Sequence, residues 1–157
     1  MSKEDIPTKE SLIVALDGSP SSLAALKWAA NYAERLSMHI NVVNAWQYHN
    51  TAMDFGALAF GSAGYVSGDD PHEWSKQILK ECVEEVFGSE HTDVQLTSIE
   101  GDPSETLISK SEKAELLVMG SRGHSKLVDL ILGSVSQKCL AQAKCPVVIV
   151  HAPENLP

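Results

Sequence analysis

Five short runs that are apolar or alternate between apolar and polar residues are distributed along the chain, and longer amphipathic segments separate them. The runs cover residues 12–16, 40–46, 94–99, 116–119 and 147–150. Each has the length of a strand, and several are rich in valine and isoleucine, which favour the pleated backbone. The first run is apolar without interruption, a pattern typical of strands buried on both faces of a sheet. We therefore predict five strands.

The segments between these runs carry apolar positions at helical spacing. Ser19 and Pro20 predict an N-cap followed by a first-turn proline. The Gly101-Asp102-Pro103 turn predicts the start of a later helix in the same way. The four expected helices cover residues 20–36, 72–87, 103–113 and about 135–143.

Strands that alternate with helices predict right-handed crossovers and a parallel sheet. The expected fold is α/β: a doubly wound, five-stranded parallel sheet with helices on both faces. We expect a single domain over residues 1–157, with a core of about 11–151 and a long, partly disordered loop at about 47–71. In such sheets ligands collect at the carboxyl ends of strands near the switch in strand order.

Charge and composition narrow the classes of function. The formal net charge is -9, which gives no electrostatic basis for binding nucleic acid or anionic lipid. The polar start and the absence of a long apolar run argue against export and membrane insertion, so a cytoplasmic protein is expected. The three cysteines lack metal-ligand spacing and are interpreted as reduced thiols.

The most informative motif follows the fourth predicted strand. It reads Gly120-Ser121-Arg122-Gly123, then nine residues, then Gly133-Ser134. Glycines 120 and 123 are expected to take positive φ and to bring the backbone close to a triphosphate, and Arg122 adds a charge-assisted contact. The N–H groups of residues 133–135 would hold phosphate at a helix start, and the Ser134 hydroxyl is expected to bind phosphate or Mg²⁺.

The other half of this predicted nucleotide site comes from the ends of the first two strands. Asp17 is placed to accept hydrogen bonds from an adenine amine or a ribose hydroxyl. Ala15 and the backbone of Asn44 and Ala45 are expected to line the base. Asp17 is also a candidate cap or turn residue before the first helix, and the two roles are compatible.

Three features carry a resemblance to a known family: the glycine motif after the fourth strand, the opening Val14-Ala15-Leu16-Asp17-Gly18-Ser19, and the turn before the third helix. With them the sequence resembles universal stress proteins over residues 12–151. The resemblance implies an adenine nucleotide alpha hydrolase-like fold and an ATP-binding subgroup, with ATP, ADP or AMP as ligand. It implies a homodimer paired through the last strand, Val147 to Val150, whose apolar edge favours pairing. The residues that it implies around the nucleotide are Asp17, Ala45, Met119, Gly120, Arg122, Gly123, Gly133, Ser134 and Val135.

The motif contains few candidate catalytic side chains. Ser134, Arg122 and His124 are its only candidate groups, and no G-x-x-x-x-G-K-[ST] loop is present, so a nucleotide-dependent stress-response switch is favoured over a catalyst. Slow ATP hydrolysis remains an alternative. A homodimeric protein-interaction module that binds no nucleotide is another, and a phosphoacceptor receiver domain is disfavoured because Lys144 precedes the last strand.

Overall fold

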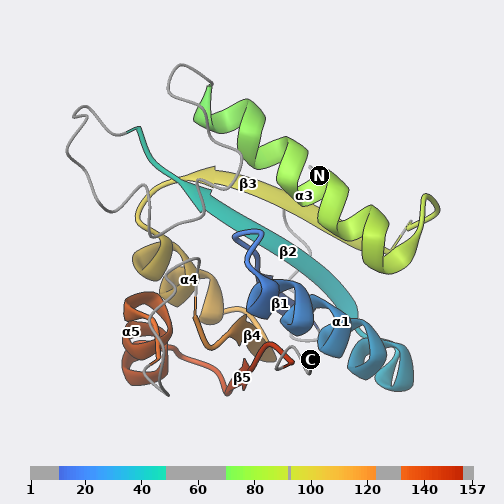
Figure 1. Ribbon diagram of the computed structural model, residues 1–157. Coiled ribbons are helices and arrows are strands. Elements are labelled where there is room, and N and C mark those ends of the chain that lie inside the picture. Colours follow the sequence, from blue (N-terminus) through green and yellow to red (C-terminus); the bar gives the residue numbers. More distant parts are fainter. Residues whose placement is uncertain (1–10, 49–69, 92, 123–131, 154–157) are drawn as a thin grey trace, which may run out of the picture.

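The computed structural model describes residues 11–48, 70–91, 93–122 and 132–153. Within these ranges five strands alternate with four helices (Figure 1). The strands are β1 (Ser11–Ala15), β2 (His39–Trp46), β3 (Val94–Glu100), β4 (Leu116–Gly120) and β5 (Val147–Val150). The helices are α1 (Pro20–Leu36), α3 (Pro71–Phe87), α4 (Pro103–Ser111) and α5 (Ser134–Gln142).

All strand pairs are parallel, and their order in the sheet is β3-β2-β1-β4-β5. The chain therefore builds outward from β1 to β3, then returns and builds in the other direction from β4 to β5. The reversal places β1 beside β4, with Leu12 opposite Leu116. The switch point of the sheet lies between the carboxyl ends of these two strands, where ligands of open α/β sheets collect.

Each face of the sheet buries its own apolar cluster. On one face α1 and α3 cover Leu12, Val14 and Val42. On the other face α4 and α5 cover Ile13, Val43 and other side chains that point the opposite way (Figure 1). Strand residues alternate between the two clusters because successive side chains leave opposite faces. The predicted doubly wound sheet, with helices on both faces, is confirmed.

The helix ends follow local capping. Ser19 is the N-cap of α1, and its hydroxyl accepts the Ser22 N–H, as the sequence predicts. The helix α4 ends at Ser111 and not near Lys113 as expected, because Lys113 N–H bonds the Lys110 carbonyl at 3.2 Å. Bonds of this i→i+3 type tighten the chain out of the α-helical path. Residues 49–69 of the expected long loop lie outside the described residues.

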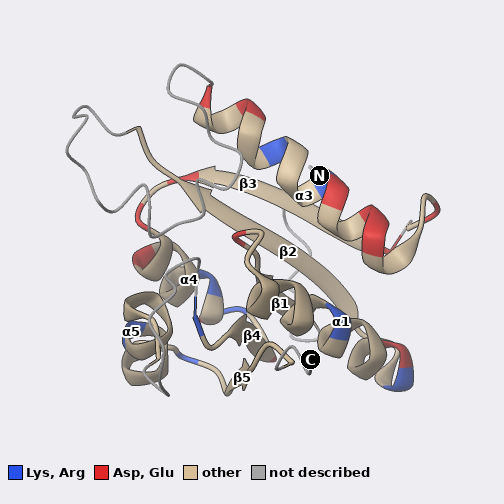
Figure 2. Cartoon of the chain, viewed as in Figure 1, with Lys and Arg blue, Asp and Glu red and all other residues tan. Residues whose placement is uncertain are grey.

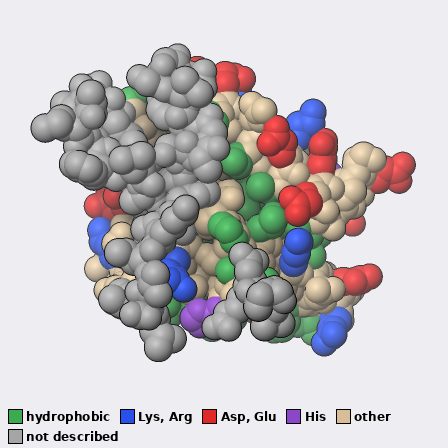
Figure 3. Space-filling model, in the orientation of Figure 1, with side chains coloured by type: hydrophobic (Ala, Val, Ile, Leu, Met, Phe, Trp, Pro, Cys, Tyr) green, Lys and Arg blue, Asp and Glu red, His purple; other side chains and the backbone are tan. Residues whose placement is uncertain are grey.

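The surface over α1 and α3 combines acidic and apolar side chains. Carboxylates outnumber basic side chains along α3 (Figure 2). Hydrophobic side chains gather in the middle of the same face (Figure 3), and Trp28 stacks on Tyr32 with ring centroids 4.9 Å apart.

All three cysteines are free thiols. Within the described ranges, every helix is too short or too polar to cross a lipid bilayer.

Candidate functional site

A cavity opens at the carboxyl ends of β1, β2 and β4, beside the switch point. Its volume is about 110 Å³, and it is open to solvent on one side. The first turns of α4 and α5 complete its walls. The strand side contributes Ala15, Leu16, Asp17, Val43, Asn44, Ala45, Met119, Gly120 and Arg122, and the helices contribute Ser22, Pro103, Leu107, Gly133, Ser134, Val135 and Ser136.

The structure brings most of the predicted site residues to this one cavity. Nine of the ten residues expected from the sequence line its wall, and they come from four separate segments. The tenth, Gly123, lies outside the described residues. The nine are Ala15, Asp17, Ala45, Met119, Gly120, Arg122, Gly133, Ser134 and Val135.

The α5 end of the cavity presents an uncapped helix N-terminus. The N-cap residue is Gly133, which has no side chain to cap the first turn. The other three described helices are capped by Ser19, Asp70 and Asp102. The α5 ladder begins with the Gln137 N–H bonded to the Gly133 carbonyl at 2.9 Å. The N–H groups of Ser134, Val135 and Ser136 have no partner within the helix, and the helix dipole makes this end favourable for an anion. The Gly133 N–H, which was expected to hold phosphate as well, donates to the Ser121 carbonyl instead.

Another part of the cavity wall is apolar. Met119 and Leu107 are each 3% exposed and line it with Val43, which is 1% exposed. The small side chains of Ala15 and Ala45 lie at the strand ends beside them. Small and apolar wall residues leave a slot that suits a planar, weakly polar group. The cavity wall thus combines apolar side chains with a helix start that favours an anion.

Polar groups from β1 and β2 lie along the same wall. The Asp17 Oδ1 accepts the Ser19 N–H at 2.8 Å, so Asp17 shapes the turn into α1 while its side chain lines the cavity. Asn44 Nδ2 donates to the Leu16 carbonyl at 2.7 Å, which ties the end of β2 to the end of β1. The buried Asn44 Oδ1 has no hydrogen-bond partner among the described residues.

Gly120 corrects one expectation from the sequence. Its φ is not positive, and the positive φ beside the cavity belongs to Gly18, at 83°. Gly120 is instead pressed against the start of α1. A Cβ at this position would lie 2.4 Å from Ser21 Oγ and 2.7 Å from Ser22 N. Glycine is therefore required here for close packing of two backbones, and not for an unusual backbone conformation.

Sequence reasoning did not single out the contribution of α4. Pro103 and Leu107 line the cavity, although their pattern on its own indicates only a helix start and a core position. Leu16, Ser22, Val43 and Ser136 were missed in the same way. The useful signal is topological: α4 follows β3 and folds back over the carboxyl edge, so its first turn lies at the site.

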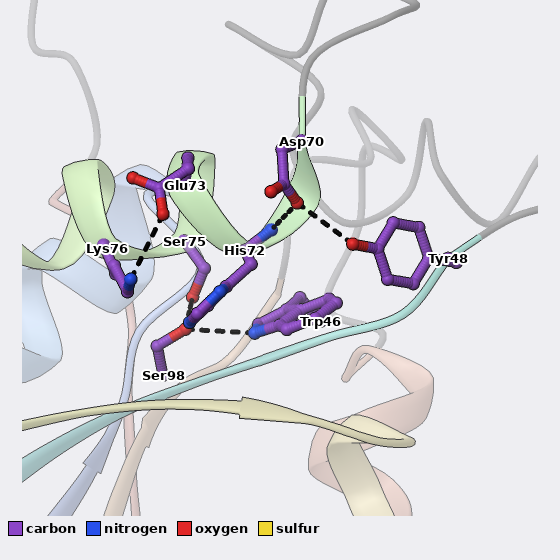
Figure 4. A network of polar contacts seen from close by, with 8 residues as sticks. All are labelled: Trp46, Tyr48, Asp70, His72, Glu73, Ser75, Lys76 and Ser98. Atoms are coloured by element: carbon purple, nitrogen blue, oxygen red, sulfur yellow. Dashed lines mark hydrogen bonds and ion pairs between the residues drawn. The ribbon is translucent and has the colours of Figure 1, made fainter.

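A network of polar and aromatic contacts continues beyond Ala45 (Figure 4). The Trp46 Nε1–H donates to Ser98 Oγ at 3.0 Å, and the hydroxyls of Ser98 and Ser75 are 2.7 Å apart. His72 stacks on Trp46 with centroids 5.2 Å apart. Tyr48 donates to Asp70 at 3.1 Å. These contacts join the end of β2 to β3 and the first turn of α3.

Comparison with known proteins identifies the family. The model of the universal stress protein family matches residues 10–151. The chain belongs to the universal stress protein family. Stress response protein NhaX of Bacillus subtilis (strain 168) is 31% identical over 160 residues, which cover 88% of this chain and 96% of NhaX.

Solved universal stress proteins share the fold. One, crystallised in complex with cAMP, is 25% identical with a TM-score of 0.65, and the match covers 92% of this chain and 98% of that one. Another, from Archaeoglobus fulgidus in complex with dAMP, is 18% identical with a TM-score of 0.61. Its match covers 89% of this chain and 96% of that chain.

Proposed function

We propose that this universal stress protein binds ATP or a related adenine nucleotide in the cavity and acts as a nucleotide-dependent switch in a stress response. The phosphates would lie at the α5 end, against Gly133, Ser134 and Val135. The base would lie in the apolar slot between the ends of β1, β2 and β4. Met119, Ala15 and Ala45 line that slot.

The observation that carries the proposal is the uncapped start of α5. Its Gly133 N-cap leaves the first-turn N–H groups without a capping side chain, and Gly133, Ser134 and Val135 all line the cavity. A polyphosphate accepts hydrogen bonds from such N–H groups and carries the charge that the helix dipole favours. This local geometry holds an anion despite the net charge of -9.

The apolar part of the cavity wall supports a nucleoside. Adenine is planar and largely apolar on its faces, which matches the wall formed by Val43, Leu107 and Met119. Asp17 and Asn44 also line the cavity. The unpartnered Asn44 Oδ1 favours a ligand that brings a hydrogen-bond donor, such as an amine or a sugar hydroxyl.

Two universal stress proteins of the same fold provide independent support, since they were crystallised with cAMP and with dAMP. Both ligands contain adenine and one phosphate. A ligand that extends toward α5 with further phosphates would use the Ser134 hydroxyl, which lies at the first helical position. That hydroxyl can bind phosphate directly or through Mg²⁺.

A switch is favoured over a catalyst by the groups that line the cavity. Phosphoryl transfer needs a water-positioning base and metal ligands near the terminal phosphate. Asp17 is the only carboxylate among the lining residues of the described chain, and its Oδ1 already accepts the Ser19 N–H. Arg122 and Ser134 can stabilise charge but are weak bases. We therefore expect at most slow ATP hydrolysis.

The sharpest test introduces a negative charge at Ser134. In Ser134→Asp the carboxylate lies in the first turn of α5, where the helix dipole stabilises the fold by about 0.3–1 kcal/mol. The same carboxylate repels a bound polyphosphate, so we expect ATP affinity to fall by about tenfold or more. Equilibrium dialysis with labelled ATP, with and without Mg²⁺, measures the affinity, and thermal unfolding measures the stability.

Ser134→Asn is the matched control, because it has nearly the same shape without the charge. It should retain ATP binding to within a few-fold. Unchanged ATP affinity in a stable Ser134→Asp variant would contradict the assignment of phosphate to α5. If the unsubstituted chain shows no saturable binding of ATP, ADP or AMP, the protein-interaction module that binds no nucleotide becomes the better description.

The proposal includes a homodimer that pairs through β5. Within the described residues β5 pairs only with β4 and forms the edge of the sheet. Its four residues are all apolar and half-buried. An apolar edge strand with open backbone groups is a template for pairing with a second strand, and a second copy of β5 satisfies it.

A further inference from the structure

The first turn of α1 holds the backbone that leaves β4. Ser19 Oγ donates to the Arg122 carbonyl at 3.3 Å, and the Ser21 hydroxyl donates to the same oxygen. The Arg122 N–H donates back to Ser21 Oγ at 3.4 Å. Ser19 is fully buried and Ser21 is 4% exposed. Both backbone groups of Arg122 are therefore fixed by two serines that are a hundred positions away in sequence.

The two preceding residues are held from other elements. Ser121 N–H donates to the Val150 carbonyl, and Gly133 N–H donates to the Ser121 carbonyl, both at 2.9 Å. The Ser136 hydroxyl donates to the Gly120 carbonyl at 2.9 Å. As a result, the chain segment that leaves β4 and the segment that enters α5 are tied together beside the cavity.

The helix N-termini of α1 and α5 have different neighbours. At α1 the positive end of the dipole meets the Arg122 carbonyl oxygen, and the Ser19 side chain caps the first turn. At α5 the first turn opens on the cavity without a side-chain cap. The start of α1 therefore binds the backbone of Arg122, whereas the start of α5 is available to bind a ligand.

We propose that Ser21, assisted by Ser19, is a positioning residue for polyphosphate. Its hydroxyl fixes the backbone of Arg122, which lines the cavity, before the ligand arrives. A fixed backbone avoids the ordering cost that a loose one incurs on binding. This inference rests on the proposed function and deepens it, because it assigns the selection of phosphate-bearing ligands to a residue outside the cavity wall.

The test compares ATP with adenosine, which has the base and sugar but no phosphate. In Ser21→Ala we expect ATP affinity to fall about five- to tenfold, the loss associated with a buried hydrogen bond. Adenosine affinity should change less than twofold, because adenosine does not reach the segment that Ser21 holds. Isothermal titration of both ligands gives the ratio of affinities, which a general loss of stability does not alter.

Ser111→Ala is the matched control. Ser111 is 1% exposed, and its hydroxyl also links two segments, through the Ile108 carbonyl at 2.6 Å and the Lys144 N–H at 2.8 Å. The control should leave the ATP-to-adenosine ratio unchanged. If Ser21→Ala does not fold, Ser19→Gly removes the second hydroxyl at a position where glycine is tolerated, and the ratio should fall in the same direction.

Each outcome has one interpretation. A selective loss of ATP affinity in the Ser21 variant, and not in the Ser111 variant, supports the positioning role. An equal loss for ATP and adenosine, or no loss for either, overturns it while leaving the proposed function intact. Absence of ATP binding by the unsubstituted chain overturns the proposed function itself, and the positioning role with it.

Discussion

At the scale of single residues, Gly120 shows how one small side chain lets two elements meet. It ends β4 and lies against Ser21 and Ser22 at the start of α1. Two of the three atoms nearest to a Cβ added at this position would be backbone atoms, which cannot rotate away. Any larger residue must therefore separate the strand from the helix.

Gly120→Ala is expected to destabilise the fold by about 2–3 kcal/mol, the usual cost of overpacking a tight site. Urea unfolding measures this loss. The reduction in nucleotide binding should then follow the loss of folded protein. The double variant Ser21→Gly with Gly120→Ala should recover little stability, because the backbone contacts remain. Full recovery would show that only the Ser21 hydroxyl opposes the added methyl group.

Asp102 gives the stability a pH dependence that can be attributed to one carboxylate. Its Oδ1 accepts the Ser104 hydroxyl at 2.5 Å and the Glu105 N–H at 2.9 Å. These bonds, the Ser104 bond first, lower the pKa of Asp102 below its ordinary value of 3.8. The folded carboxylate therefore contributes stability above pH 3.8, and this contribution is lost as the pH falls through the lower folded pKa.

Asp102→Asn retains an oxygen acceptor without the charge, so it isolates this effect. We expect the wild-type chain to be more stable than the variant near pH 7, and the difference to disappear at about pH 2. The effect should be small because Asp102 is only half-buried. Thermal unfolding across this range checks it, and a difference that is constant with pH would contradict the role of the charge.

At the scale of elements, the contacts around Trp46 join β2, β3 and α3. Ser98 is central to them, because its hydroxyl bonds both the Trp46 indole N–H and the Ser75 hydroxyl. Ser75 is fully buried. Removing the Ser98 hydroxyl thus takes a hydrogen-bond partner from two polar groups, the Trp46 indole N–H and the buried Ser75 hydroxyl.

Ser98→Ala is expected to cost about 2–3 kcal/mol, since unsatisfied buried groups lose more than the bond itself is worth. Ser75→Ala is the control. It removes one hydroxyl but preserves the Trp46 to Ser98 bond, so it should cost about 1 kcal/mol. Denaturant unfolding followed by tryptophan fluorescence measures both variants, and equal costs would contradict the central place of Ser98.

At the scale of the whole molecule, the backbone of β5 determines how a second copy would pair. The carbonyls of Pro146 and Val150 accept N–H groups from β4 and from the residue that follows it. Because backbone groups alternate in direction along a strand, the N–H of Ile149 is directed away from β4. Its side chain packs on the α4 and α5 side of the sheet.

Ile149→Pro removes that outward N–H, and proline is tolerated on the open side of an edge strand. We expect the proline variant to raise the dissociation constant of the proposed dimer by at least about tenfold. Ile149→Ala is the control, because it loses similar side-chain packing but retains the N–H. Analytical ultracentrifugation measures both, and equal dissociation constants for the two variants would argue against pairing through β5.

The strand and helix pattern was readable from the sequence because it depends on local periodicity. The uninterrupted apolar run of β5 and the Ser19-Pro20 start of α1 carry their own signals. The candidate site was largely predictable for a related reason. Parallel strands bring their carboxyl ends to one edge, so residues that follow β1, β2 and β4 meet whatever their separation along the chain.

Tertiary structure decided what local pattern cannot encode. Three of its features join segments that are distant in the sequence. They are the close contact of Gly120 with Ser21, the bonds from Ser19 and Ser21 to the Arg122 carbonyl, and the position of Leu107 at the cavity. Such contacts depend on the order in which strands are placed in the sheet and on the height of each helix above it. The amino-acid sequence by itself determined the helices, the strands and the family. Packing between these elements determined the position of each site residue.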